Sequence, residues 1–426
     1  MQNLRDRFKM DFKSRISLVC GIFGLLSIWL VVNNTDPAVT IPHPVMPKPN
    51  AHDFYVAAGS AMKDGKQIVD AVSRKPSRTY SAAQKAAFVR QNAGVLVNVQ
   101  AGFAYPYLNP PIRSWNADTE YYTRFRQLVC LFTLKGELRA GHGDWSGAAE
   151  SYLDGLRFGE DIQKGSPLLG HLAGSTYRNI ARRRIWAVVE HLNVAQTQAV
   201  ITRLTGIQER HVPFVDMIQE EKWVGQAARS DFLRDTGKSY PTLSSKDSHG
   251  QTIPDLSMYY LYRSKRRIMD DFTTYMDRSA QIAQQPYSMH KPAPPLPTDI
   301  LNAALTIPVL QYRIKDVESE TQNGLLLVSL ALHSFRLEQG HCPKTLAELV
   351  PTYLKKLPED PFARGGTFRY HSLGSRYLLY SVGPDGSDDN GTPIDDPSKM
   401  MTPHPETRYD VLENSVGDVI AGINLQ

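Results

Sequence analysis

Residues 312–339, YRIKDVESETQNGLLLVSLALHSFRLEQ, predict a long helix that organises the C-terminal part of the chain. Apolar residues recur three or four positions apart at Leu325, Val328, Leu332 and Phe335, which is the spacing of one helix face. Gly340 follows directly and favours a helix end, because glycine readily adopts the left-handed conformation found there.

Two short strands are expected after this helix. Residues 367–371 and 376–382 alternate apolar or aromatic with polar side chains, and the turn sequence SLGS at 372–375 separates them. Residues 300–426 are therefore predicted to form an α+β domain in which one long helix packs on a small antiparallel sheet.

An acidic loop follows the second predicted strand. The stretch SVGPDGSDDNGTPIDDP, residues 381–397, contains no basic residue and five aspartates: Asp385, Asp388, Asp389, Asp395 and Asp396. A Ca²⁺ ion takes six to eight oxygen ligands, and a flexible glycine-rich loop can bring carboxylates and carbonyls together around it. The same composition is also typical of an ordinary exposed turn, so the residues alone leave both interpretations open.

The order of motifs around this loop resembles the globular domain of the major pseudopilin of type II secretion systems. The matching stretches, within residues 315–397, are FRLEQGHCPKTLAEL (335–349), YLKKLPEDPF (353–362) and YLLYSVGPDG (377–386). The resemblance implies a pilin-like domain in the cell envelope, related to type II secretion or pilus-like systems, with a calcium-binding loop.

Within that family the loop binds calcium through aspartates and backbone oxygens. By resemblance, Asp385 matches the aspartate of the first turn, and Asp395 and Asp396 match the closing pair. Asp388 and Asp389 lie in the variable middle of the loop. The resemblance thus implies a structural Ca²⁺ ion.

The N-terminal sequence predicts a membrane anchor. After Arg15, residues 16–32 form an uncharged run of 17 residues, which as a helix is about 25 Å long. Five basic residues precede the run and none follows before Lys48, so residues 1–15 are expected in the cytoplasm. We therefore expect a single-pass protein of a bacterial inner membrane with most of its chain outside the cytoplasm; a cleaved signal peptide is the alternative.

The region between anchor and C-terminal domain is predicted to be helical. Residues 33–50 and 286–299 are rich in proline, which disfavours helix, and they are expected to be a stalk and a linker around an all-α body at 51–285. Within this body, residues 136–159 resemble the second half of a tetratricopeptide unit. An ordinary antiparallel helical hairpin is the alternative.

The composition of the chain argues against nucleic-acid binding. The chain has 426 residues, a formal net charge of +5 and 42% hydrophobic residues, and its basic residues are not interleaved with aromatic ones, so nucleic-acid binding is not expected. The basic residues Arg178 and Arg182 to Arg184 are expected on a solvated helix face.

No nucleophile-elbow, P-loop or zinc-protease motif is present, so catalytic residues are not predicted. The sequence favours a scaffold that binds an unknown envelope protein. The alternative is an envelope-anchored hydrolase with its site in the helical body, for which His171 and Glu190 are the candidate residues. A hydrolase should have a deep pocket with converging polar groups, whereas a scaffold should have grooves and flat faces.

Overall fold

A computed structural model describes residues 12–423, except 74, 115–116, 235–262, 288–291, 375, 401 and 403–404. The helices are α1 (Phe12–Asn34), α2 (Ala51–Ser60), α3 (Gly65–Val72), α4 (Ala82–Gln91), α5 (Ala93–Gly102), α6 (Tyr121–Gly141), α7 (Trp145–Asp161), α8 (Leu168–Trp186), α9 (Val194–Gln208), α10 (Phe214–Arg234), α12 (Lys265–Ala283), α13 (Ile300–Leu305) and α14 (Arg313–Gln339). Short 3₁₀ helices are η2 (Val189–His191), η4 (Val309–Tyr312), η5 (Leu346–Leu349), η6 (Pro397–Lys399) and η7 (Pro405–Tyr409).

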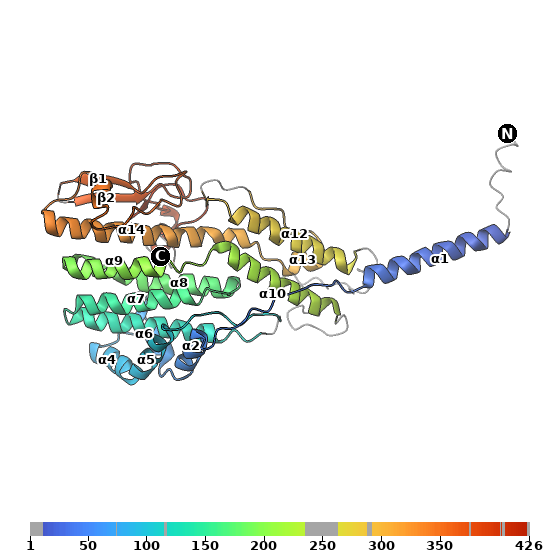
Figure 1. The fold of residues 1–426 in the computed structure, drawn as a ribbon, viewed down its shortest axis with the longest axis horizontal. Coiled ribbons are helices and arrows are strands. Elements are labelled where there is room, and N and C mark those ends of the chain that lie inside the picture. The colour runs from blue at the N-terminus through green and yellow to red at the C-terminus, as the bar shows by residue number, and fades with distance from the viewer. Residues whose placement is uncertain are drawn as a thin grey trace.

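The described strands form one antiparallel sheet in the order β1 (Arg369–Leu373), β2 (Arg376–Ser381) and β3 (Val419–Ile420). Arg369 pairs with Tyr380, and Tyr380 pairs in turn with Ile420. The sheet lies over α14, whose other side packs on α8 and α9 (Figure 1). Helix α14 is thus the layer between the sheet and the helical body.

The expected α+β fold class with a transmembrane helix is wrong, because the chain is mainly helical and its small sheet lies only near the C-terminus. The long helix itself is confirmed at Arg313–Gln339, and Gly340 after it has a φ of 76°. However, every residue from 321 to 335 is buried, instead of one face alone. Helices and sheet cover α14 from both sides, and this all-round burial makes it part of a helical assembly.

The predicted membrane anchor at residues 16–32 is also wrong. These residues are helical within α1, but none of the described helices is long and apolar enough to cross a membrane. At about 25 Å, the uncharged run falls short of a hydrocarbon core of about 30 Å. The predicted single-pass location in an inner membrane depended on this segment and is wrong with it. Of the predicted cytoplasmic segment, residues 1–11 lie outside the described residues.

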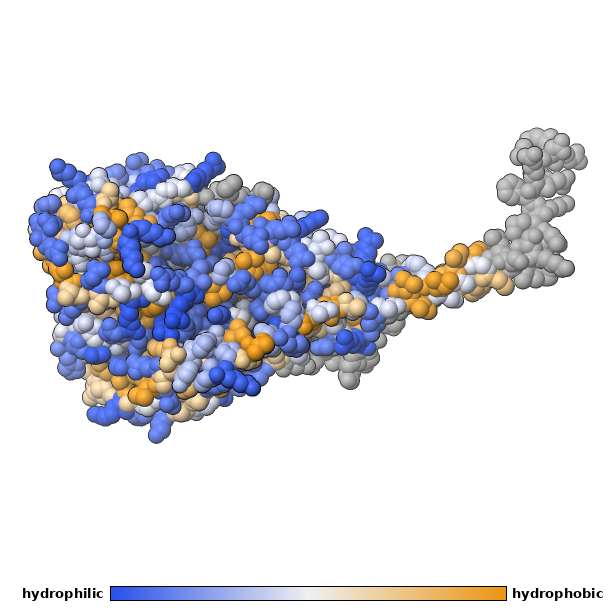
Figure 2. Space-filling model, viewed as in Figure 1, coloured by the Kyte–Doolittle hydropathy of each residue, from blue (hydrophilic) through white to orange (hydrophobic). Residues whose placement is uncertain are grey.

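Helix α1 extends away from the rest of the molecule (Figure 1). Several of its large apolar side chains are exposed, and they form the orange surface of this projection in Figure 2. Residues 35–50, which follow it, contain no helix or strand, in line with their prolines.

The apolar core is continuous across the predicted linker. The largest cluster of buried apolar residues includes Leu204 of α9, Leu325 of α14 and Leu379 of β2. A smaller cluster joins α8, α10, α12 and η4 through residues such as Phe214 and Phe272. The predicted domain boundary at 286–299, partly outside the described residues, stays a prediction.

The helical hairpin at 136–159 is formed by α6 and α7. Asp144 caps α7, since its side chain accepts a hydrogen bond from the backbone N–H of Gly147 at 2.9 Å. Gly143 between the two helices has a φ of 78°, where glycine is favoured. The hairpin places Glu160, near the end of α7, beside α8 and α14.

Buried Glu318 of α14 gives a prediction about pH. Its Oε2 lies 3.4 Å from Lys315 Nζ, and burial raises the pKa of the carboxyl to about 7. The folded chain binds this proton more tightly than the unfolded chain, because the pKa of Glu318 is higher in the folded state. Protonation of Glu318 therefore stabilises the fold. This stabilisation is complete below pH about 4.5 and is lost as pH rises through 7. Glu318→Gln, which cannot ionise, should therefore raise the melting temperature by a few degrees more at pH 8 than at pH 5.

Thermal melts of the full chain at both pH values measure this difference. Glu120→Gln, a change at an exposed position far along the chain from α14, is the control and should show no such pH dependence. An equal effect of Glu318→Gln at pH 5 and pH 8 would contradict the assignment.

Candidate functional site

A cavity of about 1190 Å³ opens beside the first half of α14. Its wall combines acidic, basic and apolar side chains from α7, α14, the α9–α10 connection and the loop before β1. The lining residues include Glu160, Gln208, His211, Pro213, Phe214, Tyr287, Arg313, Asp316, Val317, Glu320, Asn323, Glu359, Asp360 and Arg364. This volume is somewhat larger than that of most small-molecule sites, which usually measure about 300–1,000 Å³.

Helical spacing explains why α14 contributes several of these side chains. Arg313, Asp316, Val317 and Glu320 are three, four and seven positions apart, so they lie on one face, and that face borders the cavity. Asp316 and Glu320 are like charges one turn apart, which destabilises a helix unless positive charge lies nearby. This acidic pair was the sequence signal that could have indicated the site.

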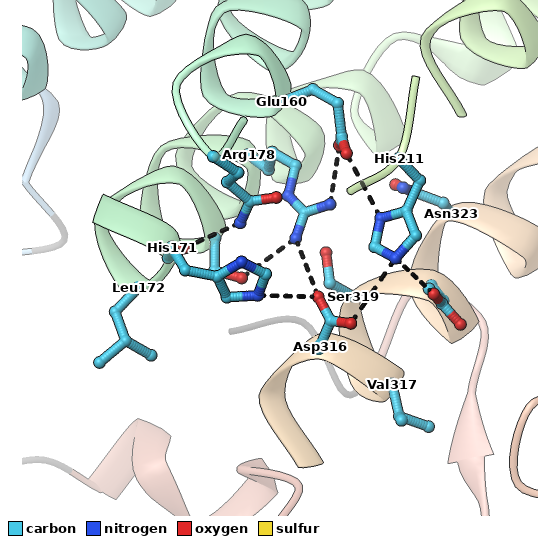
Figure 3. Close-up of polar contacts among 12 residues, drawn as sticks. Glu160, His171, Leu172, Arg178, His211, Asp316, Val317, Ser319 and Asn323 are labelled. Carbon is cyan, nitrogen blue, oxygen red and sulfur yellow. Dashed lines mark hydrogen bonds and ion pairs between the residues drawn. The ribbon is translucent and has the colours of Figure 1, made fainter. Parts of the chain in front are cut away.

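Positive charge reaches the pair from His211, in the α9–α10 connection (Figure 3). His211 Nε2 lies 2.7 Å from Glu320 Oε1 and 3.6 Å from Asp316 Oδ2, and Nδ1 lies 3.3 Å from Glu160 Oε1. Burial alone would lower the pKa of His211, but the three carboxylates around its ring raise it to about 12. Without another cation, His211 is therefore protonated at neutral pH.

Asp316 is held from its other side by α8. Its Oδ1 lies 3.2 Å from His171 Nε2 and 3.7 Å from Arg178 Nη2. Burial favours the neutral acid, but the interactions with the imidazoles of His171 and His211 outweigh it and keep the pKa of Asp316 well below its usual range. Asp316 is thus a buried, ionised carboxylate whose Oδ2 faces His211.

Arg178 joins the two buried acids. Its Nη1 donates to Glu160 Oε2 at 2.7 Å, while Nη2 lies near Asp316, so one guanidinium connects α7, α8 and α14 (Figure 3). The Arg178 side chain is 1% exposed. Arg178 and Arg182 are therefore buried, contrary to the solvated face expected from the sequence.

Of the two residues named for the alternative hydrolase, one lies in this group and one does not. His171 contacts Asp316, whereas Glu190 pairs on the surface with Arg336. The sequence reading missed Glu160, His211 and Asp316, because these residues are far apart in the chain and form no linear motif.

The acidic loop lies elsewhere, and its aspartates are bonded within the loop and to nearby groups. Asp388 accepts from Tyr380 Oη at 2.9 Å and from Arg369 Nε at 3.1 Å, while Asp395 pairs with Arg408. The remaining three make backbone contacts: Asp385 and Asp396 accept from the N–H of Ser387 and Ser398, and the Asp389 N–H donates to Asp418.

Asp418 is an additional acid at this loop that the sequence reading did not single out. It is fully buried and accepts from the Gly391 N–H at 2.7 Å, and burial raises its pKa to about 6. Over the described residues, the one group of three metal-binding side chains is His211, Asp316 and Glu320, and not the loop aspartates. The calcium site at the loop stays a prediction.

No protein-family model, curated protein or solved structure matches the chain. The comparisons therefore assign no family, and the pseudopilin resemblance stays a prediction.

Breaking the Arg178 bridge should destabilise the fold. Arg178→Met leaves Glu160 and Asp316 without their shared guanidinium, and removing one partner of a buried ion pair costs about 3–5 kcal/mol. Urea unfolding of the full chain measures the loss. Arg139→Met is the matched control: Arg139 pairs with Asp144 at the surface, where a pair contributes at most about 1 kcal/mol. Equal losses for both variants would contradict a structural role for the bridge.

The calcium prediction can be tested separately. If the loop binds Ca²⁺, millimolar Ca²⁺ should raise the melting temperature of the full chain, because a ligand bound only by the folded form stabilises it. Asp385→Asn or Asp396→Asn should reduce this increase, whereas the surface variant Asp277→Asn should not. No increase in the wild-type chain would show that the loop is an ordinary turn.

Proposed function

We propose that the chain is a hydrolase whose active site is the cavity beside α14. The observation that carries this proposal is the convergence of His211, Asp316 and Glu320 on the wall of a cavity of about 1190 Å³. A large cavity on which several polar side chains converge is the default candidate for an active site. A deep pocket with converging polar groups is also what we expected of a hydrolase, whereas a scaffold was expected to have grooves and flat faces.

The three groups differ in their access to a substrate. Asp316 is buried at 5% side-chain exposure, His211 is intermediate at 24%, and Glu320 is 40% exposed. Glu320 is therefore the carboxylate that we expect to contact water or substrate. His171 and Arg178 lie behind the wall, and buried Glu160 borders the cavity beside His211; these three are positioning residues.

Glu320 and His211 provide the carboxylate and the positive charge that a hydrolysis reaction requires. A carboxylate can take a proton from water, and an adjacent positive charge can stabilise the negative charge that develops on the substrate oxygen. In the reaction, the water oxygen bonds to the electrophilic carbon or phosphorus, the bond to the leaving group breaks, and the water proton passes to that group. Ester, amide and phosphate-ester bonds all fit this chemistry.

The cavity wall limits the substrate to a molecule of moderate size with both apolar and polar parts. Phe214, Tyr287 and Val317 offer apolar surface, whereas Arg313 and Arg364 carry positive charge. The scaffold role expected from the sequence stays a prediction, because it rests on the extent of the helical body and on the lack of linear catalytic motifs.

A panel of chromogenic substrates tests the proposal: p-nitrophenyl acetate and butyrate, amino-acid p-nitroanilides, and p-nitrophenyl mono- and diesters of phosphate. We expect the full chain to hydrolyse at least one class. Glu320→Gln should lower kcat/KM by about 100-fold or more, since it removes the accessible carboxylate.

Glu190→Gln is the matched control, because Glu190 is an exposed glutamate outside the cavity and should leave kcat/KM unchanged. Melting temperatures of both variants establish that they are folded. A wild-type chain that hydrolyses no member of the panel, or a Glu320→Gln variant with full activity, would count against the hydrolase.

A further inference from the structure

We propose that His211, Asp316 and Glu320 bind one divalent transition-metal ion, with Zn²⁺ as the best-fitting candidate. This inference rests on the proposed function and deepens it, because it makes the hydrolase metal-dependent. The ligand atoms would be His211 Nε2, one oxygen of Asp316 and one oxygen of Glu320. One such atom from each residue lies within 4.8 Å of the others.

One ligand distance already suits a small tetrahedral ion, and the other needs a movement of Glu320. Zinc–nitrogen and zinc–oxygen bonds of about 2.0–2.2 Å place tetrahedral ligands about 3.3–3.6 Å apart. His211 Nε2 and Asp316 Oδ2 are already 3.6 Å apart. The 2.7 Å between Nε2 and Glu320 Oε1 has to widen by several tenths of an ångström, and Glu320, at 40% exposure, has room to move.

Supporting residues orient each ligand in the way that metal sites require. A metal-binding histidine usually donates its other ring N–H to a carboxylate, and Glu160 Oε1 lies 3.3 Å from His211 Nδ1. His171 and Arg178 lie against Asp316 Oδ1, which directs Oδ2 toward His211. These three supporting residues lie on α7 and α8, so helices hold the groups that orient His211 and Asp316.

A buried polar atom also points to this arrangement. Glu160 is 2% exposed, and its Oε1 has no hydrogen-bond partner of normal geometry, although His211 Nδ1 is near. A small rotation of the His211 ring on binding an ion would complete this hydrogen bond.

Charge balance favours a dication. Glu160, Asp316 and Glu320 contribute three negative charges, and Arg178 contributes one positive charge. With His211 as a neutral ligand, these four contacting groups keep a net charge of −2, to which a divalent ion is complementary.

The donor set selects the type of metal. An imidazole nitrogen suits Zn²⁺ and related transition metals, whereas Ca²⁺ prefers six to eight oxygens. Three protein ligands with a fourth position facing a cavity are typical of catalytic zinc sites. The cavity and the acidic loop would therefore bind different metals.

An ion at this position would activate the water for hydrolysis, since bound zinc lowers the pKa of a water ligand to about 7. The water gives its proton to the Glu320 oxygen that does not hold the ion, and its oxygen bonds to the electrophilic carbon or phosphorus. The bond to the leaving group then breaks, and Glu320 returns the proton to that group. Atoms and charge balance without another reactant.

Isothermal titration calorimetry of the full chain, after removal of metal with EDTA and dialysis, tests the inference with ZnCl₂, MnCl₂ and CaCl₂. We expect one Zn²⁺ per chain at micromolar or lower Kd. His211→Asn and Glu320→Gln should weaken Zn²⁺ binding by about 100-fold or more, and Glu160→Gln by about 10-fold. Co²⁺ in place of Zn²⁺ should give the visible absorption of a tetrahedral site, and His211→Asn should abolish it.

His142→Asn, which replaces an exposed histidine outside the cavity, is the control and should bind Zn²⁺ like the wild type. Melting temperatures identify variants that fail to fold, and Glu320→Gln, at the most exposed ligand, keeps the test valid if His211→Asn does not fold. Zn²⁺ binding that His211→Asn and Glu320→Gln leave unchanged, or no binding by the wild type, overturns the inference.

The proposed metal site and the proposed hydrolase activity can be refuted independently of each other. Zn²⁺ binding that depends on His211, without hydrolysis of any substrate, supports the metal site and contradicts the hydrolase. Hydrolysis that persists in EDTA and depends on Glu320 supports the hydrolase and contradicts the metal site, leaving protonated His211 as the cation of the group.

Discussion

The site depends on the guanidinium of Arg178, which lies between the carboxylates of Glu160 and Asp316. Removing these charges from water costs several kcal/mol per ion, and well-packed apolar side chains could connect the same helices at no greater cost. Stability alone therefore does not explain the arrangement. Orientation does, because the bridge fixes two acids that face His211 on the wall of a cavity.

The division of α14 into two halves makes this orientation possible. Its first half carries Asp316 and Glu320, whereas its second half, from Leu325 to Phe335, is buried in the apolar core. The core positions the helix, and the helix positions the acids. Charged groups can therefore remain in place at a site where their mutual repulsion would otherwise separate them.

Helices and strands whose signals lie within a short stretch of sequence could be predicted. The long helix was expected at 312–339 and lies at Arg313–Gln339, because its apolar spacing and Gly340 mark it clearly. The hairpin of β1 and β2 was found within two residues of its expected limits. The fold class could not be predicted from such local signals. It depends on whether one face of α14 or its whole circumference is buried, and the spacing of apolar residues does not distinguish the two.

The candidate site was less predictable for a related reason. Its residues come from α7, α8, α14 and the α9–α10 connection, and only packing brings them together. His171 was named as a candidate, but Arg178 was expected on a solvated face, because charged residues on a helix are usually exposed.

His211 differs from the other members of the group in one respect: it belongs to no helix. Helix α9 ends at Gln208 and α10 begins at Phe214, so five residues connect them and carry the imidazole. Substitutions in this connection can shift His211 while α14 and the core keep their positions. Evolution could thus tune the chemistry of the cavity through residues 209–213 at little cost to the stability of the fold.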